Sequence, residues 1–156
     1  MRRVGERGSP VRWNLVDERL ESRKTVVFNS ADAACPRLAS LSLAALDVFD
    51  LPVCVNLYAT GAATSVSAPP HTDKQRVFVL QTQGKKRWRV YSPPDPRRRP
   101  AADPLARGKG GDGLAFSELE ETPIFDVVLS AGQALYVPAG FPHTTATASD
   151  DQSLHI

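Results

Sequence analysis

Two histidines and one aspartate have the types and spacing of metal ligands. His71 and Asp73 are one residue apart in PPHTDKQRVFVLQTQGKKRWRVY, residues 69–91, and His143 follows a Pro-Gly turn in LSAGQALYVPAGFPHTTAT, residues 129–147. In an extended strand, residues i and i+2 share a face, so an imidazole and a carboxylate converge. Alone, this pair also fits an ordinary hydrogen-bonded pair. With a second histidine on a nearby strand, it forms the facial triad typical of non-haem Fe(II), which leaves three coordination positions open.

Lys86 provides an independent indication of a binding site. Strand alternation in KKRWRVY places Lys86 on the same face as Trp88 and Val90, which is the apolar face. An ammonium on that face costs several kcal/mol unless an anion meets it. The anion is either a protein carboxylate or the distal carboxylate of a bound oxo-acid. Tyr58, near the end of VNLYA, could donate a phenolic hydrogen bond to the same carboxylate, or it could be a core aromatic residue.

Strands dominate the chain from Pro52 onward and must position these side chains. The runs are short, are separated by Gly, Pro, Ser or Asp, and read VCVNLYA, RVFVLQTQ, KRWRVYS, IFDVVLS, QALYVPAG, HTTATA and SLHI. Many short strands of this kind predict a sandwich or barrel. Residues 69–91 read as two strands around a tight turn. Trp88, Phe78 and Leu80 are predicted to be core residues. Residues 92–113, rich in Pro, Gly and Arg, are predicted to form a functional or disordered loop.

The N-terminal part of the chain has a different pattern. The first 22 residues predict an irregular lead-in, and a β-branched run after them predicts a strand that ends near Phe28. Apolar residues at helical spacing then predict one amphipathic helix with Pro36 in its first turn. We therefore expect a single domain in which residues 1–50 pack on a β-barrel core formed by residues 51–156.

Composition limits the classes of function. The chain has 156 residues, with 19 basic and 17 acidic side chains and a formal charge of +2, which is too balanced to indicate nucleic-acid binding by bulk electrostatics. Cys35 and Cys54 have no C-x-x-C spacing and are expected to be reduced thiols. No apolar run approaches the roughly 20 residues that span a bilayer. We expect a soluble intracellular protein, cytoplasmic or nuclear, with no membrane partner.

The combined motifs resemble those of a known family. H-x-D, then F-V-L-Q-x-x-G-K-K-x-W, then G-x-x-L-Y-V-P-x-G-x-x-H are similar to the JmjC-type, cupin-like oxygenases that depend on Fe(II) and 2-oxoglutarate, especially the ribosomal oxygenases. The resemblance implies a double-stranded β-helix, a mainly β jelly-roll barrel. It implies that His71, Asp73 and His143 bind iron and that Lys86, with Tyr58, holds the 2-oxoglutarate carboxylate. Thr147, with Thr145, shares the face of His143 and is a candidate to line the cofactor pocket.

The resemblance also implies an activity. O2 and 2-oxoglutarate would be consumed, succinate and CO2 released, and a protein side chain, such as one of a ribosomal protein, hydroxylated. Two alternatives stay open: an N-methyl-lysine demethylase, and a catalytically inactive cupin-like binding module. In the second, the basic segment that includes Arg97–Arg99 would contact RNA or an acidic surface, although a solvated loop is favoured.

Two further expectations concern the end of the chain. His155, on the last strand, is expected to be structural rather than a metal ligand. Family members continue beyond SLHI, so the sequence is expected to be a minimal form or a fragment. An unpaired last strand would expose its edge, so a second chain is expected to cover it, which makes a homodimer a candidate assembly.

Overall fold

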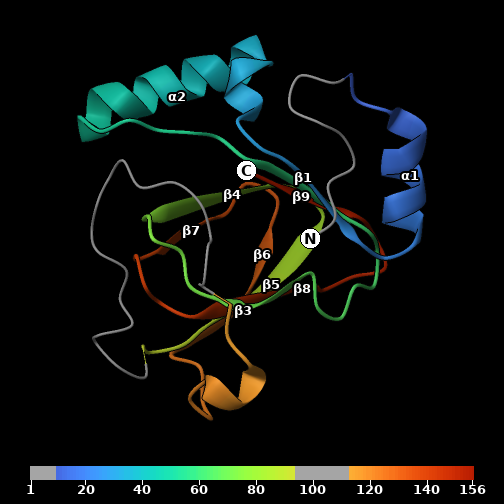
Figure 1. Ribbon diagram of the computed structural model, residues 1–156, viewed down its shortest axis with the longest axis vertical. Coiled ribbons are helices and arrows are strands. Elements are labelled where there is room, and N and C mark those ends of the chain that lie inside the picture. Colours follow the sequence, from blue (N-terminus) through green and yellow to red (C-terminus); the bar gives the residue numbers. More distant parts are fainter. Residues whose placement is uncertain (1–9, 94–112) are drawn as a thin grey trace.

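Two antiparallel sheets form most of the structure, a computed structural model that describes residues 10–93 and 113–156 (Figure 1). The strands are β1 (Thr25–Phe28), β2 (Leu57–Thr60), β3 (Ala68–His71), β4 (Val77–Gln83), β5 (Lys85–Val90), β6 (Phe125–Ser130), β7 (Ala134–Val137), β8 (His143–Thr147) and β9 (Ser153–His155). The helices are α1 (Trp13–Glu21) and α2 (Pro36–Phe49), with short 3-10 turns η1 (Ala31–Ala33) and η3 (Phe116–Glu118). The chain is therefore mainly β, as predicted.

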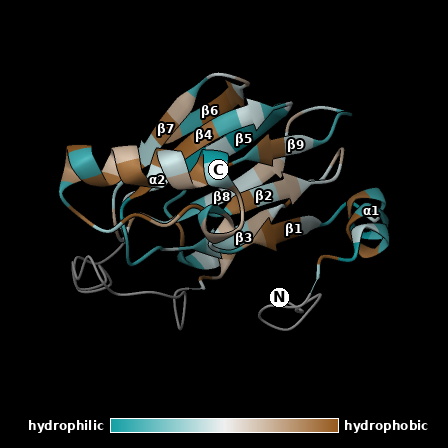
Figure 2. Cartoon of the chain, turned by 90° about the horizontal axis from the view of Figure 1, so that it is seen from above, coloured by the Kyte–Doolittle hydropathy of each residue, from teal (hydrophilic) through white to brown (hydrophobic). Residues whose placement is uncertain are grey.

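The sheets have the strand orders β1-β2-β9-β4-β7 and β3-β8-β5-β6. From β2 to β9 the chain changes sheet at every connection except that between β5 and β6. Such alternation winds the strands into the jelly-roll barrel of cupins, which confirms the predicted fold class. Figure 2 shows the two helices outside the strands.

Gly84 lies at a corner between the sheets. The two strands predicted around a tight turn are β4 and β5, but they do not pair with each other, because β4 pairs with β7 and β9 whereas β5 pairs with β6 and β8. Gly84 has a φ of +66°, and a Cβ atom there would lie 2.1 Å from the carbonyl oxygen of Gln152. Only glycine fits this corner without displacing the neighbouring backbone. Strand alternation alone does not reveal which sheet each strand joins.

The interior of the barrel contains both apolar and polar side chains. Val79, Trp88 and Leu129 form a buried apolar cluster, which confirms Trp88 as a core residue. Phe78 was predicted in the core but is 53% exposed, because Val79 and its alternate neighbours point inward and Phe78 points outward. Leu80, also on that outer side, is only half-buried.

The N-terminal segment contains more regular structure than the sequence suggested. Helix α1 replaces the part of the expected irregular lead-in from Trp13 to Glu21, and Val16 and Leu20 bury its apolar side against Val26 of β1. Helix α2 begins at the predicted Pro36, yet none of its residues is buried. Phe49 at its end stacks on Phe78 with ring centroids 5.1 Å apart. Within the described ranges, neither helix has the length and hydropathy of a membrane-spanning segment.

Candidate metal centre and acid-binding pocket

His71 and His143 are brought together by strand pairing. His71 ends β3 and lies opposite His143, the first residue of β8, with ring centroids 4.3 Å apart. Strand β3 contains Pro69 and Pro70, which it tolerates because it is an edge strand of the smaller sheet. The convergence of the two imidazoles therefore depends on the register between strands that are distant in sequence.

Asp73 completes the cluster from the segment that follows β3. Its Oδ1 lies 3.8 Å from Nε2 of His71, and its Oδ2 lies 3.4 Å from Nε2 of His143. The candidate ligand atoms of the three residues all lie within 4.8 Å of one another. The backbone N–H of Gly140 donates to the carbonyl oxygen of Asp73 at 2.9 Å, so the turn before His143 is tied to the aspartate.

Backbone hydrogen bonds orient both imidazole rings. Nδ1 of His71 lies 2.8 Å from the carbonyl oxygen of Pro69, and Nδ1 of His143 lies 3.0 Å from that of Phe141. A carbonyl oxygen only accepts, so each Nδ1 carries a hydrogen and each ring directs its Nε2 toward Asp73. Hydrogen bonds of this kind fix the tautomer of histidines that ligate metals.

The three side chains fit a divalent metal ion. A cation placed between the three side chains would be attracted by the carboxylate of Asp73 and could be coordinated by one ring nitrogen of each histidine. One carboxylate and two imidazoles are the ligand set of non-haem Fe(II), with positions left for further ligands. The predicted residues therefore converge as expected, and their role as ligands is taken up under the proposed function.

Lys86 points into the barrel, as strand alternation predicted. Its side chain is 1% exposed, and its Nζ donates to Oγ1 of Thr60 at 2.6 Å. Among the described residues, no carboxylate forms an ion pair with it. Burial lowers the pKa of Lys86 from its ordinary value of 10.5 to about 7. A buried amine with one neutral partner suits an anion that enters the barrel.

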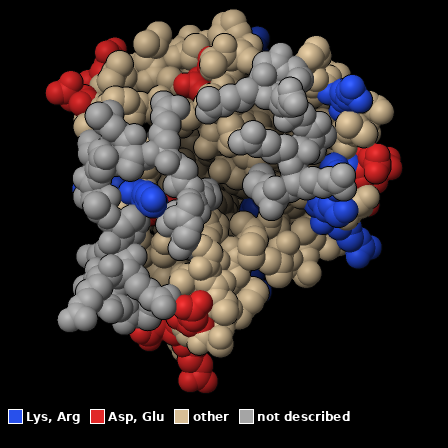
Figure 3. Space-filling model, viewed as in Figure 1, with Lys and Arg blue, Asp and Glu red and all other residues tan. Residues whose placement is uncertain are grey.

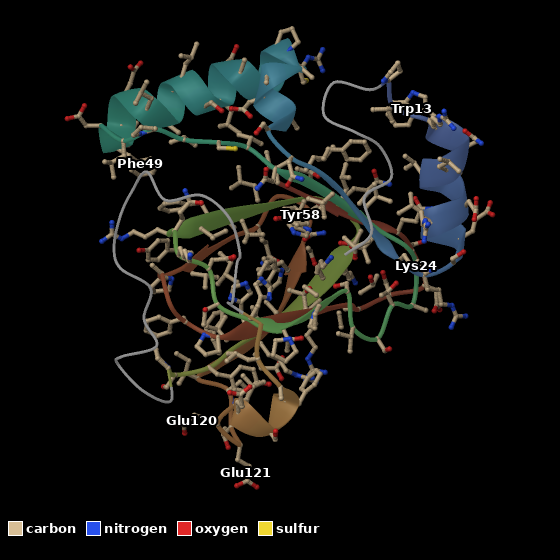
Figure 4. The ribbon with its side chains drawn as sticks, viewed as in Figure 1. Trp13, Lys24, Phe49, Tyr58, Glu120 and Glu121 are labelled. Carbon is tan, nitrogen blue, oxygen red and sulfur yellow. The ribbon has the colours of Figure 1, made fainter. Side chains whose placement is uncertain are left out.

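Thr147 lies on β8, the strand that pairs with the strand of Lys86, whereas Tyr58 lies on β2 in the other sheet. Tyr58 of β2 is near the centre of the molecule, whereas Trp13, Lys24, Glu120 and Glu121 are peripheral (Figure 4). Thr147 is directly opposite Lys86 in the pairing of β5 with β8, and its hydroxyl donates to the carbonyl oxygen of Gly61 at 3.1 Å. The space-filling view shows this side of the molecule hollowed at its centre (Figure 3).

His155, predicted to be structural rather than a metal ligand, is not part of the cluster of candidate metal ligands. His155 is buried on β9, with its ring stacked on Tyr58 at a centroid distance of 4.8 Å. The alternation of SLHI, which places Ser153 and His155 on one face, was the available signal. The basic segment with Arg97–Arg99, and most of the loop predicted over residues 92–113, lie outside the described residues.

Comparison with known proteins identifies the family. Residues 41–156 match the model of the JmjC domain. The chain belongs to the JmjC domain family. Over 153 residues, or 98% of its length, this JmjC chain is 35% identical to a Drosophila mojavensis protein named bifunctional lysine-specific demethylase and histidyl-hydroxylase NO66. It is 40% identical over 108 residues, or 69% of its length, to a Dictyostelium discoideum protein of the same name.

The JmjC chain is much shorter than these relatives, spanning 16% of the Drosophila protein and 20% of the Dictyostelium protein. Its fold is similar to a structure of YcfD, a ribosomal oxygenase from Escherichia coli in complex with cobalt and 2-oxoglutarate. The TM-score is 0.61, at 19% identity over 85% of this chain and 30% of YcfD. The family assignment agrees with the cofactors predicted from the sequence, Fe(II) and 2-oxoglutarate.

Proposed function

We propose that this chain is an Fe(II)- and 2-oxoglutarate-dependent oxygenase domain that hydroxylates a protein side chain. The observation that carries the proposal is the convergence of His71, Asp73 and His143, with both Nδ1 atoms fixed by backbone carbonyls. Lys86, buried without an ion-pair partner among the described residues, supports a site for an acid in the same barrel.

Each side chain has a specific role in this proposal. His71, Asp73 and His143 would hold Fe(II), and Lys86 with Tyr58 would hold the distal carboxylate of 2-oxoglutarate, with Thr147 lining the pocket. When bound, the metal and the oxo-acid supply oxidative decarboxylation, which yields succinate and CO2 and places one oxygen atom of O2 on the substrate. Trp88 and Val79 belong to the buried apolar cluster of the barrel and would help to keep water from the bound acid.

The substrate class is proposed from the names of the relatives. Both NO66 relatives are named as lysine demethylases and histidyl-hydroxylases, and YcfD is named as a ribosomal oxygenase. A histidine side chain of a ribosomal or similarly basic protein is therefore our first candidate. N-methyl-lysine demethylation is the second, because hydroxylation of an N-methyl group gives an unstable product that loses its carbon.

Turnover against a panel of peptides tests the proposal. Purified protein would be supplied with Fe(II), 2-oxoglutarate and O2, together with peptides containing histidine, arginine, asparagine or methyl-lysine. We expect succinate formation with a mass increase of one oxygen atom on one peptide class, abolished in His71→Ala. A mass decrease of one CH2 unit, with release of formaldehyde, would indicate demethylation. Failure of the wild-type protein to bind either metal or 2-oxoglutarate would refute the oxygenase proposal and favour a binding module.

A further inference from the structure

Three buried polar atoms gather in the interior of the barrel without a partner. Among the described residues, Oε1 of Gln81, Nε1 of Trp88 and Nδ1 of His155 are the buried side-chain atoms that form no hydrogen bond. Gln81 and Tyr58 are both register partners of His155, from the strands on either side of β9. The ring of Trp88 lies 5.6 Å from that of His155. Buried polar atoms are normally satisfied, so this cluster indicates a bound group.

The ring of His155 is held by packing rather than by hydrogen bonds. Tyr58 stacks on it at an interplanar angle of 5°, and Trp88 meets it edge-on at 81°. His71 and His143 differ, because a backbone carbonyl fixes Nδ1 in each of them. Nδ1 of His155, in contrast, is buried and has no hydrogen-bond partner among the described residues. This nitrogen is therefore left for a ligand.

Lys86 faces the same interior as His155. The Nζ atom of Lys86 contacts Thr60, which lies two residues after Tyr58 on β2 and so shares its face. Burial, and next the charge of Lys86, lower the pKa of His155 to about 3. The imidazole is neutral near pH 7 and carries one N–H. A neutral donor can bind a carboxylate without adding a second charge that would repel the ammonium of Lys86.

The hydrogen-bonding character of the unpaired atoms indicates which of them could bind a carboxylate. Oε1 of Gln81 only accepts hydrogen bonds, so it does not match a carboxylate oxygen. The N–H groups of His155 and Trp88 do match one. Trp88 also stacks on His143 at a centroid distance of 5.8 Å, so its ring lies between the candidate metal ligand and His155. An acid that reaches from the metal centre toward Lys86 would pass these donors.

We propose that His155 is a binding residue for the acid cosubstrate: its N–H donates to the same carboxylate that the ammonium of Lys86 binds. This inference rests on the proposed function. It assigns to His155 a role in affinity for the acid, not in binding the metal. Removing its N–H should therefore weaken acid binding while leaving metal binding and folding intact.

Isothermal titration of the Mn(II)-loaded protein with N-oxalylglycine, an unreactive analogue of 2-oxoglutarate, tests this role. His155→Phe keeps a ring between Tyr58 and Trp88 but has no N–H, and we expect it to weaken binding by about tenfold or more. The matched variant His155→Gln keeps a neutral donor and should stay within about threefold of wild type. The affinity for Mn(II) alone and the cooperativity of unfolding should not change in either variant.

A double-mutant cycle tests whether His155 and Lys86 bind the same carboxylate or whether His155 affects acid binding indirectly. If His155 and Lys86 bind one carboxylate, adding His155→Phe to Lys86→Met should weaken binding little further, because the losses are not additive. Losses that multiply, or an unchanged affinity in His155→Phe, would overturn the role of His155. If the wild-type protein binds no N-oxalylglycine, the proposed function itself fails.

The wild-type protein offers a test that does not depend on a variant folding. His155 is one of three histidines in the chain, so its imidazole nitrogens can be assigned by 15N NMR of the Zn(II)-loaded protein. We expect the His155 resonances to shift on addition of N-oxalylglycine as its N–H gains an acceptor. Unchanged His155 resonances at saturating N-oxalylglycine would overturn the inference.

Discussion

The Nε2 atom of His143 lies 3.4 Å from the Oδ2 atom of Asp73, although the two residues belong to separate segments of the chain. The backbone hydrogen bond from Gly140 to Asp73 holds these segments together. The carboxylate is thus positioned by the fold, and the imidazole Nε2 is directed at it by the contact of Nδ1 with Phe141. Such preorganisation reduces the cost of assembling ligands around an ion.

The first prediction concerns this carboxylate. Asp73→Asn removes the negative charge while keeping the shape of the side chain, and we expect the affinity for Mn(II) to fall by about a hundredfold or more. Asp126→Asn is the matched control, because Asp126 accepts hydrogen bonds from Arg87 on the outer surface. Titration of both variants with Mn(II) measures the difference. Equal affinities would show that Asp73 is not a ligand.

The second prediction concerns the pH dependence of acid binding. Burial lowers the pKa of Lys86 to about 7, so above this pH the free protein must take up a proton before the ammonium can bind an acid. The affinity of the Mn(II)-loaded protein for N-oxalylglycine should therefore fall by up to about tenfold per pH unit above pH 7.

Lys86→Arg is the control for this pH dependence, because a guanidinium stays charged throughout the range. Its affinity is expected to be nearly independent of pH between 7 and 9. Titrations in buffers of different ionisation enthalpy would count the protons taken up. A pH profile that is flat in the wild-type protein would contradict the coupling.

The third prediction concerns stability. An unfolded chain keeps Lys86 at the ordinary pKa of 10.5, whereas the folded protein has a pKa of about 7, so the unfolded state binds more protons between these values. The free energy of unfolding of the wild-type protein therefore rises with pH across this window. Lys86→Met removes the buried charge and should raise the free energy of unfolding at pH 6.5 by about 1 kcal/mol or more.

Urea unfolding at pH 6.5 and pH 9 measures this effect. The gain from Lys86→Met should shrink at pH 9, where the wild-type amine is already neutral in the folded protein. If Lys86→Met raised the free energy of unfolding equally at both values of pH, the effect would come from packing of the methionine and not from removal of the charge.

The fourth prediction concerns the corner at Gly84. Gly84→Ala places a Cβ atom 2.1 Å from the carbonyl oxygen of Gln152 at a φ of +66°, so both a clash and backbone strain oppose it. Gly132→Ala is the matched control, with a φ of +88° and no atom within 4 Å of the new Cβ. We expect a loss of about 1–3 kcal/mol for Gly132→Ala, from strain alone, and a larger loss for Gly84→Ala. If urea unfolding gave equal losses of stability for the two variants, the backbone at the Gly84 corner would have moved to accommodate the new Cβ atom.

Much of the site followed from local patterns. The motif spacing selected His71, Asp73 and His143, and strand alternation alone placed Lys86 and Trp88 on the inner face, because alternation is a property of a single extended strand. The helix that begins at Pro36 was also predictable from local sequence, because its apolar spacing and first-turn proline are properties of consecutive residues.

Only the tertiary structure decided which elements are neighbours. The pairing of β4 with β9 and β7 left Phe78 on the outer face and made the tight turn at Gly84 a corner between the sheets. The pairing of β9 with β2 placed His155 beside Tyr58, a neighbour that the alternation of SLHI alone does not reveal. Sheet order and register arise from contacts between distant segments, so the side chains that meet across the barrel do not follow from the periodicity of any one strand.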